Sequence, residues 1–271
     1  MPKTIKKLRL AVLVSGGGTN LQAMIDRSMA GTMFAEIAVV LSDCADAYGL
    51  SRAEKAGIPS CCVDYKSYGA REITEEVLRE LPVDLDELDG RQEILKGIDP
   101  LRRRARLARL VLAERELIEI IERHRVDYVC LAGFMRLVTP YFIGYFNAGG
   151  ARRVLNIHPA LLPSFPGMHG YEDTFEYGCK WGGITVHFVD EGEDTGPIIA
   201  QAVYPIWPDD DPEKVRARGL QLEYAIYPQV INWLARGQIR FEELPGRRPR
   251  VLVVDPEYPA VLRAWAEKAL R

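Results

Sequence analysis

The N-terminal part of the chain carries the feature that most limits its fold. An apolar run at residues 8–14 stops at a polar, glycine-rich loop at residues 15–20, and Leu21, Met24 and Ile25 follow at helical spacing. A strand, a glycine loop and a helix in this order predict the opening unit of a sheet built from parallel strands.

Further apolar runs alternate with helical stretches along the chain, which is typical of parallel strands with helices on both faces of the sheet. These runs are residues 37–41, 61–63, 128–132 and 154–157. Two later runs, at residues 184–189 and 198–203, are joined by an acidic turn and predict an antiparallel pair. The predicted fold is α/β, with an open, mostly parallel, Rossmann-like sheet and a late antiparallel β pair.

The composition excludes several classes of protein. Of 271 residues, 48% are apolar and 27% are charged, and the net charge is -3. Nucleic acid is not expected as a partner, since binding to its backbone needs a surplus of Lys and Arg. Residues 8–14 form too short an apolar run for a signal peptide or a membrane span.

The cysteines and histidines indicate the compartment and the metal content. Five cysteines without a Cys-x-x-Cys pair favour reduced thiols in a cytoplasmic protein. Four scattered histidines, without cysteines or carboxylates at ligand spacing, predict no metal site.

Two segments look like additions to the main domain, which is predicted to span residues 1–241. Residues 82–104 contain an acidic run followed by Arg102, Arg103 and Arg104 and lack core periodicity. We expect a surface insertion whose opposite charges are solvated or paired with each other. Residues 242–271 form a C-terminal extension with a predicted strand at 251–254 and helix at 259–270.

The glycine loop is a candidate phosphate site, because its free backbone N–H groups lie at a helix N-terminus. No Gly-Lys-Ser/Thr follows, so it is not a P-loop, and Leu21 occupies the place of the third glycine of a dinucleotide fingerprint. The pattern favours the phosphate of a mononucleotide. A tight turn without a ligand is the alternative.

Catalytic candidates follow the strand at residues 154–157 and occupy the later acidic turn. Asn156 and His158 lie two residues apart, so in an extended segment they point to the same side. An Asn amide can stabilise an oxyanion, and a histidine can move protons at neutral pH. Asp194 is either their partner or a turn former, and His158 is either catalytic or a loop residue. His187 and His169 are expected to be structural or to line the substrate site.

Taken together, these segments resemble the glycinamide ribonucleotide formyltransferase family. The motif Asn-x-His-Pro-x-Leu-Leu-Pro at residues 156–163, followed by Asp-x-Gly-Pro at 194–197, is specific for formyltetrahydrofolate enzymes as a class. The matching segments occur in the family's order and are residues 15–23, 45–50, 131–136, 155–163, 185–189, 194–198 and 223–228.

The resemblance implies an enzyme that transfers the formyl group of 10-formyltetrahydrofolate, its co-substrate, to the amine of glycinamide ribonucleotide in de novo purine biosynthesis. It makes Asn156, His158 and Asp194 the catalytic trio, requires no metal, and leaves a homodimer open. The residues that it implies for the nucleotide are Gly17, Gly18, Thr19, Asn20 and Glu223. The residues that it implies for the folate are Arg71, Met135, Arg136, Leu137, Val138 and Asp190.

Two departures from the family pattern bear on substrate contacts. Asp43 and Cys44 replace a common Asn-Lys pair, and Leu220 stands where some members carry a Gln. A formyltetrahydrofolate deformylase is the nearest alternative, although such enzymes usually carry an additional N-terminal domain. A methionyl-tRNA formyltransferase would need a C-terminal RNA-binding domain, for which the residues after 245 are too few. The other alternative is a catalytically silent nucleotide-binding module.

Overall fold

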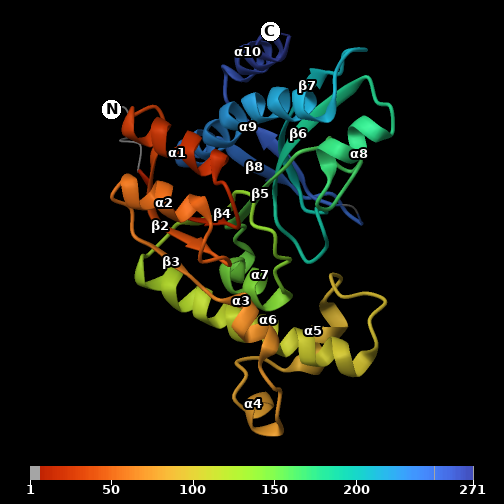
Figure 1. The fold of residues 1–271 in the computed structure, drawn as a ribbon. Helices are drawn as coiled ribbons and strands as arrows, with labels where there is room; N and C mark the ends of the chain where they lie inside the picture. Colours follow the sequence, from red (N-terminus) through yellow and green to blue (C-terminus); the bar gives the residue numbers. More distant parts are fainter. Residues whose placement is uncertain (1–6, 247, 271) are drawn as a thin grey trace.

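A seven-stranded sheet forms the centre of the computed structural model, which describes residues 7–246 and 248–270 (Figure 1). The strands are β1 (Leu8–Val14), β2 (Ala35–Ser42), β3 (Ser60–Cys62), β4 (Tyr128–Leu131), β5 (Val154–His158), β6 (Trp181–Phe188) and β7 (Ile198–Pro205). Their order is β3-β2-β1-β4-β5-β6-β7. The first five strands are parallel, and β6 pairs antiparallel with both β5 and β7. The predicted fold class is therefore confirmed.

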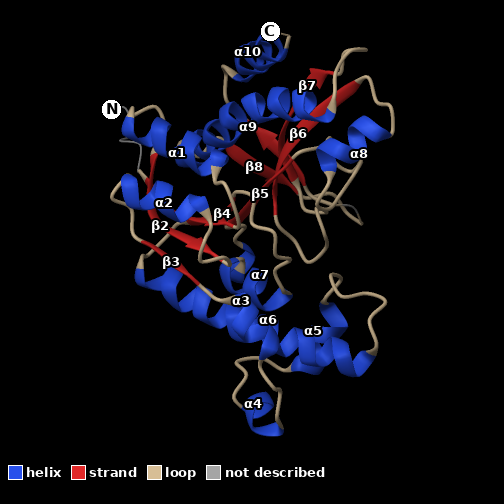
Figure 2. Cartoon of the chain, in the orientation of Figure 1, coloured by secondary structure: helices blue, strands red, loops and turns tan. Residues whose placement is uncertain are grey.

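Helices cover both faces of this sheet (Figure 2). One face packs against α1 (Thr19–Met29), α2 (Tyr48–Lys55), α8 (Gly170–Glu176), α9 (Pro212–Ala235) and α10 (Tyr258–Ala269). The other packs against α3 (Tyr65–Ala70), α6 (Pro100–Arg123) and α7 (Pro140–Phe146). No helix in residues 7–246 and 248–270 is long and apolar enough to cross a membrane.

The central position of β1 explains why its sequence is apolar throughout and does not alternate between apolar and polar residues. Leu10, Val12 and Val14 belong to the core under α1 and α9, whereas Ala11 and Leu13 belong to the core under α6 and α7. A central parallel strand is buried on both faces, so every position along it excludes water. This burial also fixes where the glycine loop after residue 14 emerges.

The C-terminal segment packs onto the main core. The short strand β8 (Ile239–Glu242) pairs antiparallel with β9 (Arg250–Val253), and α10 follows. Trp265 of α10 stacks edge-on against Trp233 of α9, at 5.8 Å between ring centroids, and the Trp233 indole N–H donates to Asp255. The strand and helix predicted for this segment are confirmed, and its separation from residues 1–241 stays a prediction.

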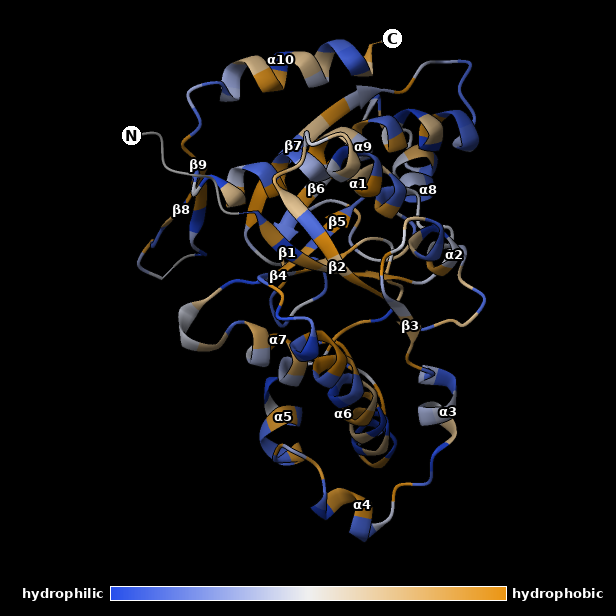
Figure 3. Ribbon diagram, turned by 90° about the vertical axis from the view of Figure 1, so that its left-hand side faces the viewer, coloured by the Kyte–Doolittle hydropathy of each residue, from blue (hydrophilic) through white to orange (hydrophobic). Residues whose placement is uncertain are grey.

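Residues 82–104, expected to be a surface insertion, are exposed at most positions but also contribute to a small core. This segment contains α5 (Leu85–Arg91), lies after the short helix α4 (Glu75–Arg79), and ends inside α6, beside which α5 lies (Figure 3). Leu85, Leu88 and Leu95 are buried in a small core with residues of α6. These few leucines are spread among many charges, so the sequence shows no core periodicity there, and an insertion relative to the family stays a prediction. The predicted pairing of charges is confirmed, as Asp89 binds Arg103 and Asp86 binds Arg104.

A buried carboxyl joins α6 to the start of α7. The two oxygens of the fully buried Glu114 accept from the backbone N–H of Thr139, at 2.7 Å, and from its hydroxyl, at 2.5 Å. Thr139 also caps α7, which begins with Pro140. Burial raises the pKa of Glu114 to about 8, although the hydrogen bonds from Thr139 oppose this shift.

We predict that Glu114→Gln makes the stability of the protein less dependent on pH. Between pH 4.5 and about 8 the folded state keeps Glu114 protonated while the unfolded state has lost the proton, so stability falls as pH rises. The slope is up to about 1.4 kcal/mol per pH unit for one such group. Thermal unfolding of the wild type and the variant at pH 5.5 and pH 7.5 tests this expectation.

The control is Glu119→Gln, an exposed position on the same helix. It should leave the pH dependence as it is in the wild type. A Glu114→Gln protein whose melting temperature changes with pH as much as that of the wild type would contradict the assignment of a neutral buried carboxyl.

Candidate active site

The candidate site lies at the carboxyl ends of β1, β4 and β5. Strand β1 has β2 on one side and β4 on the other, and open α/β sheets bind ligands where the strand order reverses in this way. The loops after β1 and β4 are joined, because Ser15 N–H donates to the Gly133 carbonyl at 3.0 Å and its hydroxyl accepts from Met135 N–H at 2.7 Å. Two loops and the end of β5 therefore meet at one edge of the sheet.

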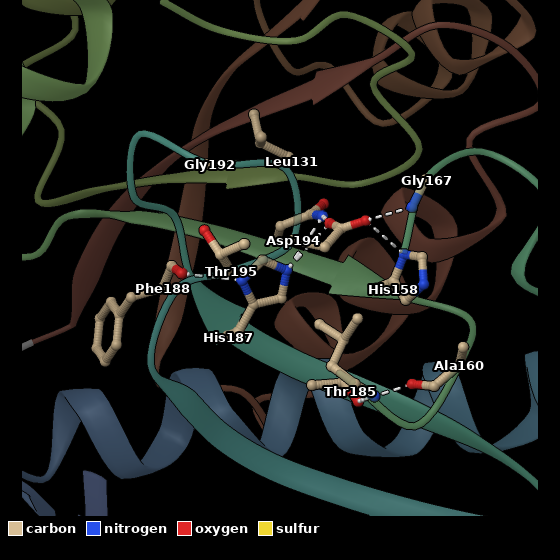
Figure 4. Close-up of polar contacts among 12 residues, drawn as sticks. Leu131, His158, Ala160, Gly167, Thr185, His187, Phe188, Gly192, Asp194 and Thr195 are labelled. Atoms are coloured by element: carbon tan, nitrogen blue, oxygen red, sulfur yellow. Dashed lines mark hydrogen bonds and ion pairs between the residues drawn. The ribbon is translucent and has the colours of Figure 1, made fainter. Parts of the chain in front are cut away.

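The structure brings the predicted trio together in one cluster. His158 Nδ1 lies 3.2 Å from Asp194 Oδ2 (Figure 4), and Asn156 Nδ2 lies 3.2 Å from Asp194 Oδ1. Asp194 adopts a left-handed backbone conformation, with φ of 52°, and Gly167 N–H donates to its Oδ2 at 2.8 Å. The turn between β6 and β7 therefore returns the Asp194 carboxylate to the end of β5.

Burial and nearby charges set the protonation states of this cluster. Burial lowers the pKa of His158, and the Asp194 carboxylate opposes this shift. Burial also acts to raise the pKa of Asp194, but His187, His158 and the Gly167 N–H outweigh it and lower the pKa. At neutral pH the pair therefore combines an ionised carboxylate with a neutral imidazole.

Both ring nitrogens of His158 face oxygen acceptors. Nε2 lies 2.8 Å from the Phe165 carbonyl, and Nδ1 faces Asp194. A neutral ring can donate to only one of these acceptors, whereas an imidazolium donates to both. The pocket is thus arranged to stabilise a proton that arrives at His158 during a reaction.

His187 is a fourth member of the cluster. Its Nε2 lies 3.5 Å from Asp194 Oδ1 and 3.4 Å from Asn156 Nδ2, and its Nδ1 lies 2.9 Å from the Phe188 carbonyl (Figure 4). His187 joins the cluster because the register of β5 with β6 pairs it with Asn156. From the sequence we expected a structural or substrate-lining residue, and His187 does line the cavity.

A cavity opens beside the trio, and most residues predicted for the folate line it. They are Met135, Arg136, Leu137, Val138 and Asp190. Sequence reasoning missed Ile94, from the segment expected to be an insertion, and Met168, from the loop after β5. Arg71 does not line this cavity or the second cavity that adjoins it. The backbone carbonyl of Arg71 accepts a hydrogen bond from Arg109 Nε at 2.8 Å. A folate contact for Arg71 stays a prediction.

Close packing against Gly49 restricts which residue can occupy the glycine loop, independently of any ligand. Gly18 has φ of 65°, and a Cβ there would lie 2.8 Å from the Gly49 Cα. No side chain of the described residues caps the N-terminus of α1, which begins at Thr19, so its first N–H groups stay available for an anion. Arg52, which sequence reasoning missed, donates to the Gly17 carbonyl at 2.8 Å and adds positive charge beside the loop.

Asn20 and Glu223, which were both predicted to bind the nucleotide, are in direct contact. Glu223 accepts from the Asn20 amide and from the Tyr171 hydroxyl. Burial raises the pKa of Glu223, although these two donors oppose the shift. Within the described residues, the buried Asn20 Oδ1 has no hydrogen-bond partner. An unpaired buried acceptor of this kind is costly unless a ligand donates to it.

Asp43, one of the residues that depart from the family pattern, pairs with an arginine. Arg136 Nε donates to Asp43 Oδ2 at 2.5 Å, so Asp43 holds a residue predicted to line the folate pocket. Leu220 is half-buried in α9. Nothing in the structure explains its replacement of the family's Gln.

Comparison with known proteins agrees with this geometry. The family model described as formyl transferase matches residues 8–231, so the chain belongs to the formyl transferase family. Among its relatives is a phosphoribosylglycinamide formyltransferase from Haemophilus influenzae, 36% identical over 87% of this chain and 91% of that protein. A solved glycinamide ribonucleotide transformylase 1 from Symbiobacterium toebii has a TM-score of 0.70 and 37% identity, over 93% of this chain and 97% of its own.

Two further proteins are matched over a smaller share of their own length. The trifunctional purine biosynthetic protein adenosine-3 of Drosophila pseudoobscura pseudoobscura is 38% identical over 86% of this chain, which spans only 14% of that protein. A formyltetrahydrofolate deformylase from Pseudomonas syringae has a TM-score of 0.67 but 23% identity, over 92% of this chain and 66% of its own. This last similarity shows the fold alone.

We predict that Asp194→Asn lowers kcat by about 10²- to 10⁴-fold, the usual contribution of general acid-base catalysis. Asn tolerates the left-handed conformation of this residue, so the turn persists while the charge is lost. His158→Ala should cost a similar factor. The double variant should be little worse than either single variant, since residues that act as a unit are not additive.

Steady-state kinetics of the three variants test this expectation. Glu176→Gln, which removes a charge from an exposed position of α8 outside the cavity, should leave kcat within a few-fold and serves as the control. A normal kcat for Asp194→Asn would reduce that residue to a turn former, and multiplicative losses in the double variant would mean that the two side chains act independently.

Proposed function

We propose that the chain transfers the formyl group of 10-formyltetrahydrofolate to the primary amine of glycinamide ribonucleotide, a step of de novo purine biosynthesis. The observation that carries this proposal is the convergence of Asn156, His158 and Asp194 on one cavity, which is lined on its other side by residues 133–138. The similarity to phosphoribosylglycinamide formyltransferases, over 87% or more of this chain, supports the choice of substrates.

The charges that develop during this reaction match the groups in the cavity. Attack of the amine on the formyl carbon creates an oxyanion on the former carbonyl and a positive charge on nitrogen. The Asn156 amide is the donor for the oxyanion. Its contacts, at 3.2 Å to Asp194 and 3.4 Å to His187, are long and weak, so exchanging one for the oxyanion costs little.

Asp194 and His158 act on the proton. Because both His158 nitrogens are engaged, the proton of the amine reaches the pair through a water that Asp194 holds. The resulting imidazolium donates to both Asp194 and the Phe165 carbonyl. The pair then returns the proton to the folate nitrogen as the bond between that nitrogen and the formyl carbon breaks. Each step uses a side chain of this protein and forms no covalent intermediate with it.

The two substrates approach from opposite sides of the trio. The nucleotide phosphate binds the N–H groups of Gly17, Gly18, Thr19 and Asn20 at the uncapped start of α1. Glu223 and the unpaired Asn20 Oδ1 accept from the sugar or the glycinamide end. The folate binds along Met135, Arg136, Leu137 and Val138, with Asp190 on the facing loop.

We also propose a cytoplasmic location. All five cysteines are free, which supports a cytoplasmic protein. A homodimer remains a prediction from the family resemblance.

We predict that the purified protein consumes 10-formyltetrahydrofolate only when glycinamide ribonucleotide is present. Formation of tetrahydrofolate is followed by absorbance, and the formylated nucleotide and free formate are measured by chromatography. Release of formate without the nucleotide would identify a deformylase. Neither product, in a protein that binds the nucleotide, would identify a silent binding module.

We predict that Gly17→Ala raises the KM for glycinamide ribonucleotide much more than the KM for the folate. A Cβ at Gly17 meets no atom of the described residues within 4 Å, so the variant should fold normally while its methyl group displaces the phosphate. Gly18 is unsuitable for this test, because its left-handed φ and its contact with Gly49 would strain any replacement.

The control is Gly144→Ala, which changes a glycine in α7 whose added Cβ also meets no atom of the described chain within 4 Å. Gly144→Ala should leave both KM values unchanged. Equal increases in both constants for Gly17→Ala would place the phosphate elsewhere.

A further inference from the structure

The glycine loop is held from behind by α2, which lies beside α1 (Figure 1). Gly49, in the first turn of α2, donates its N–H to the Gly16 carbonyl at 3.0 Å. Arg52, three residues further along α2, donates its Nε–H to the Gly17 carbonyl at 2.8 Å. Two successive carbonyl groups of the loop are therefore turned toward α2.

The direction of these carbonyl groups fixes the direction of the N–H groups that follow them. In a trans peptide the C=O of one residue and the N–H of the next point in opposite directions, and both peptides are trans here. The N–H groups of Gly17 and Gly18 therefore point away from α2. In the part of the chain that the structure describes, neither of them donates to a protein acceptor. Arg52 thus sets the orientation of the free Gly18 N–H.

Close packing of two glycines brings α2 within reach of the loop. A Cβ at Gly18 would lie 2.8 Å from the Gly49 Cα, and a Cβ at Gly49 would lie 2.8 Å from the Val14 Cγ2. Backbone therefore packs directly on backbone, which side chains at these positions would prevent. This approach places Arg52 where its side chain can reach the Gly17 carbonyl.

The Arg52 side chain is fixed by two further contacts. Its Nη1 donates to the Gln22 side-chain oxygen at 2.9 Å, and its guanidinium lies 4.8 Å from the centroid of the Tyr48 ring. Gln22 is held in turn, because its amide donates to Asp26 at 2.8 Å. Within residues 7–246 and 248–270, Arg52 forms no ion pair with a carboxylate. A fixed cation without a carboxylate partner, beside free N–H groups, favours an anionic ligand.

Asn20 independently indicates a ligand at the same turn of α1. Its side chain is only 8% exposed, and within the described residues its Oδ1 has no hydrogen-bond partner. An acceptor in this situation is expected to receive a hydrogen bond from a bound molecule. The ligand should therefore combine an anionic group with a nearby donor, as a sugar phosphate does.

We propose that Arg52 is a positioning residue for the nucleotide phosphate, because it holds the Gly17 carbonyl and so directs the Gly18 N–H at the phosphate. Without Arg52 the peptide between Gly17 and Gly18 is free to rotate, since glycine restricts the backbone very little. The inference rests on the proposed function for the position of the phosphate and goes beyond it in assigning a role to Arg52 and α2.

The test is calorimetric binding, without folate, of glycinamide ribonucleotide and of glycinamide riboside, which lacks the phosphate. The wild type should bind the nucleotide at least about 100-fold more tightly, because several N–H groups donate to the charged phosphate. Arg52→Ala should reduce this preference about 10- to 100-fold, the range for one hydrogen bond to a charged group. Binding of the riboside should stay unchanged.

Arg52→Lys separates positioning from charge. It keeps the positive charge, but a single ammonium group cannot replace the planar pair of donors at Nε and Nη1, so it should recover less than about threefold of the loss. The matched control is Lys55→Ala. Lys55 lies on the same helix, 5.3 Å from the centroid of the same Tyr48 ring, but donates to the Tyr48 hydroxyl and not to the loop. This variant should keep the wild-type preference.

An unchanged preference in Arg52→Ala overturns the proposal. Full recovery in Arg52→Lys also overturns it, since charge alone would then account for the effect. If Arg52→Ala does not fold, Gln22→Ala takes its place, because it removes the acceptor that holds Nη1. That variant should reduce the preference about 2- to 10-fold, and no reduction would overturn the proposal as well.

These measurements are independent of formyl transfer. A protein that loses the preference in Arg52→Ala but transfers no formyl group to glycinamide ribonucleotide would contradict the proposed function and leave the role of Arg52 standing. A protein whose Arg52→Ala variant transfers the formyl group with an unchanged KM for the nucleotide would contradict only the role of Arg52.

Discussion

Antiparallel pairing of β5 with β6 sets Asn156 opposite His187 and His158 opposite Thr185. Every distance in the trio depends on this register, since a slip of one residue would turn each side chain to the other face of the sheet. Strand β6 leads into the turn that carries Asp194, whose left-handed backbone directs its carboxylate back to His158. The parallel half of the sheet supplies the glycine loop at the same edge.

Burial gives this arrangement its chemistry. His158 and Asp194 are only 3% and 10% exposed, so their interaction is little screened by water. The pKa values of Asp194 and His158 are both lowered, so both groups are unprotonated at neutral pH before the reaction. Glu223 differs, since burial raises its pKa among neutral donors from Asn20 and Tyr171. The carboxyl groups that we propose for proton transfer and for nucleotide binding thus lie in opposite electrostatic environments.

The segment at residues 82–104 illustrates how a charged sequence can belong to a core and to a ligand site at once. Its leucines bury themselves against α6, its acidic residues neutralise Arg103 and Arg104, and Ile94 lines both cavities. The ion pair of Arg91 with Glu191, at 2.5 Å, further joins α5 to the loop that carries Asp194. The segment therefore borders the cavity at the trio.

The sequence by itself determined the order of strands and helices, the parallel sheet with its late antiparallel pair, the glycine loop, and the cluster of Asn156, His158 and Asp194. These features depend on local periodicity and on motifs at the ends of strands, which a single sequence carries. Only the tertiary structure decided that His187 joins the trio, that Gly18 packs on Gly49, and that Ile94 lines the cavity at the trio. Those contacts join residues far apart in the chain, and strand register and helix packing, which set them, have no local signal in the sequence.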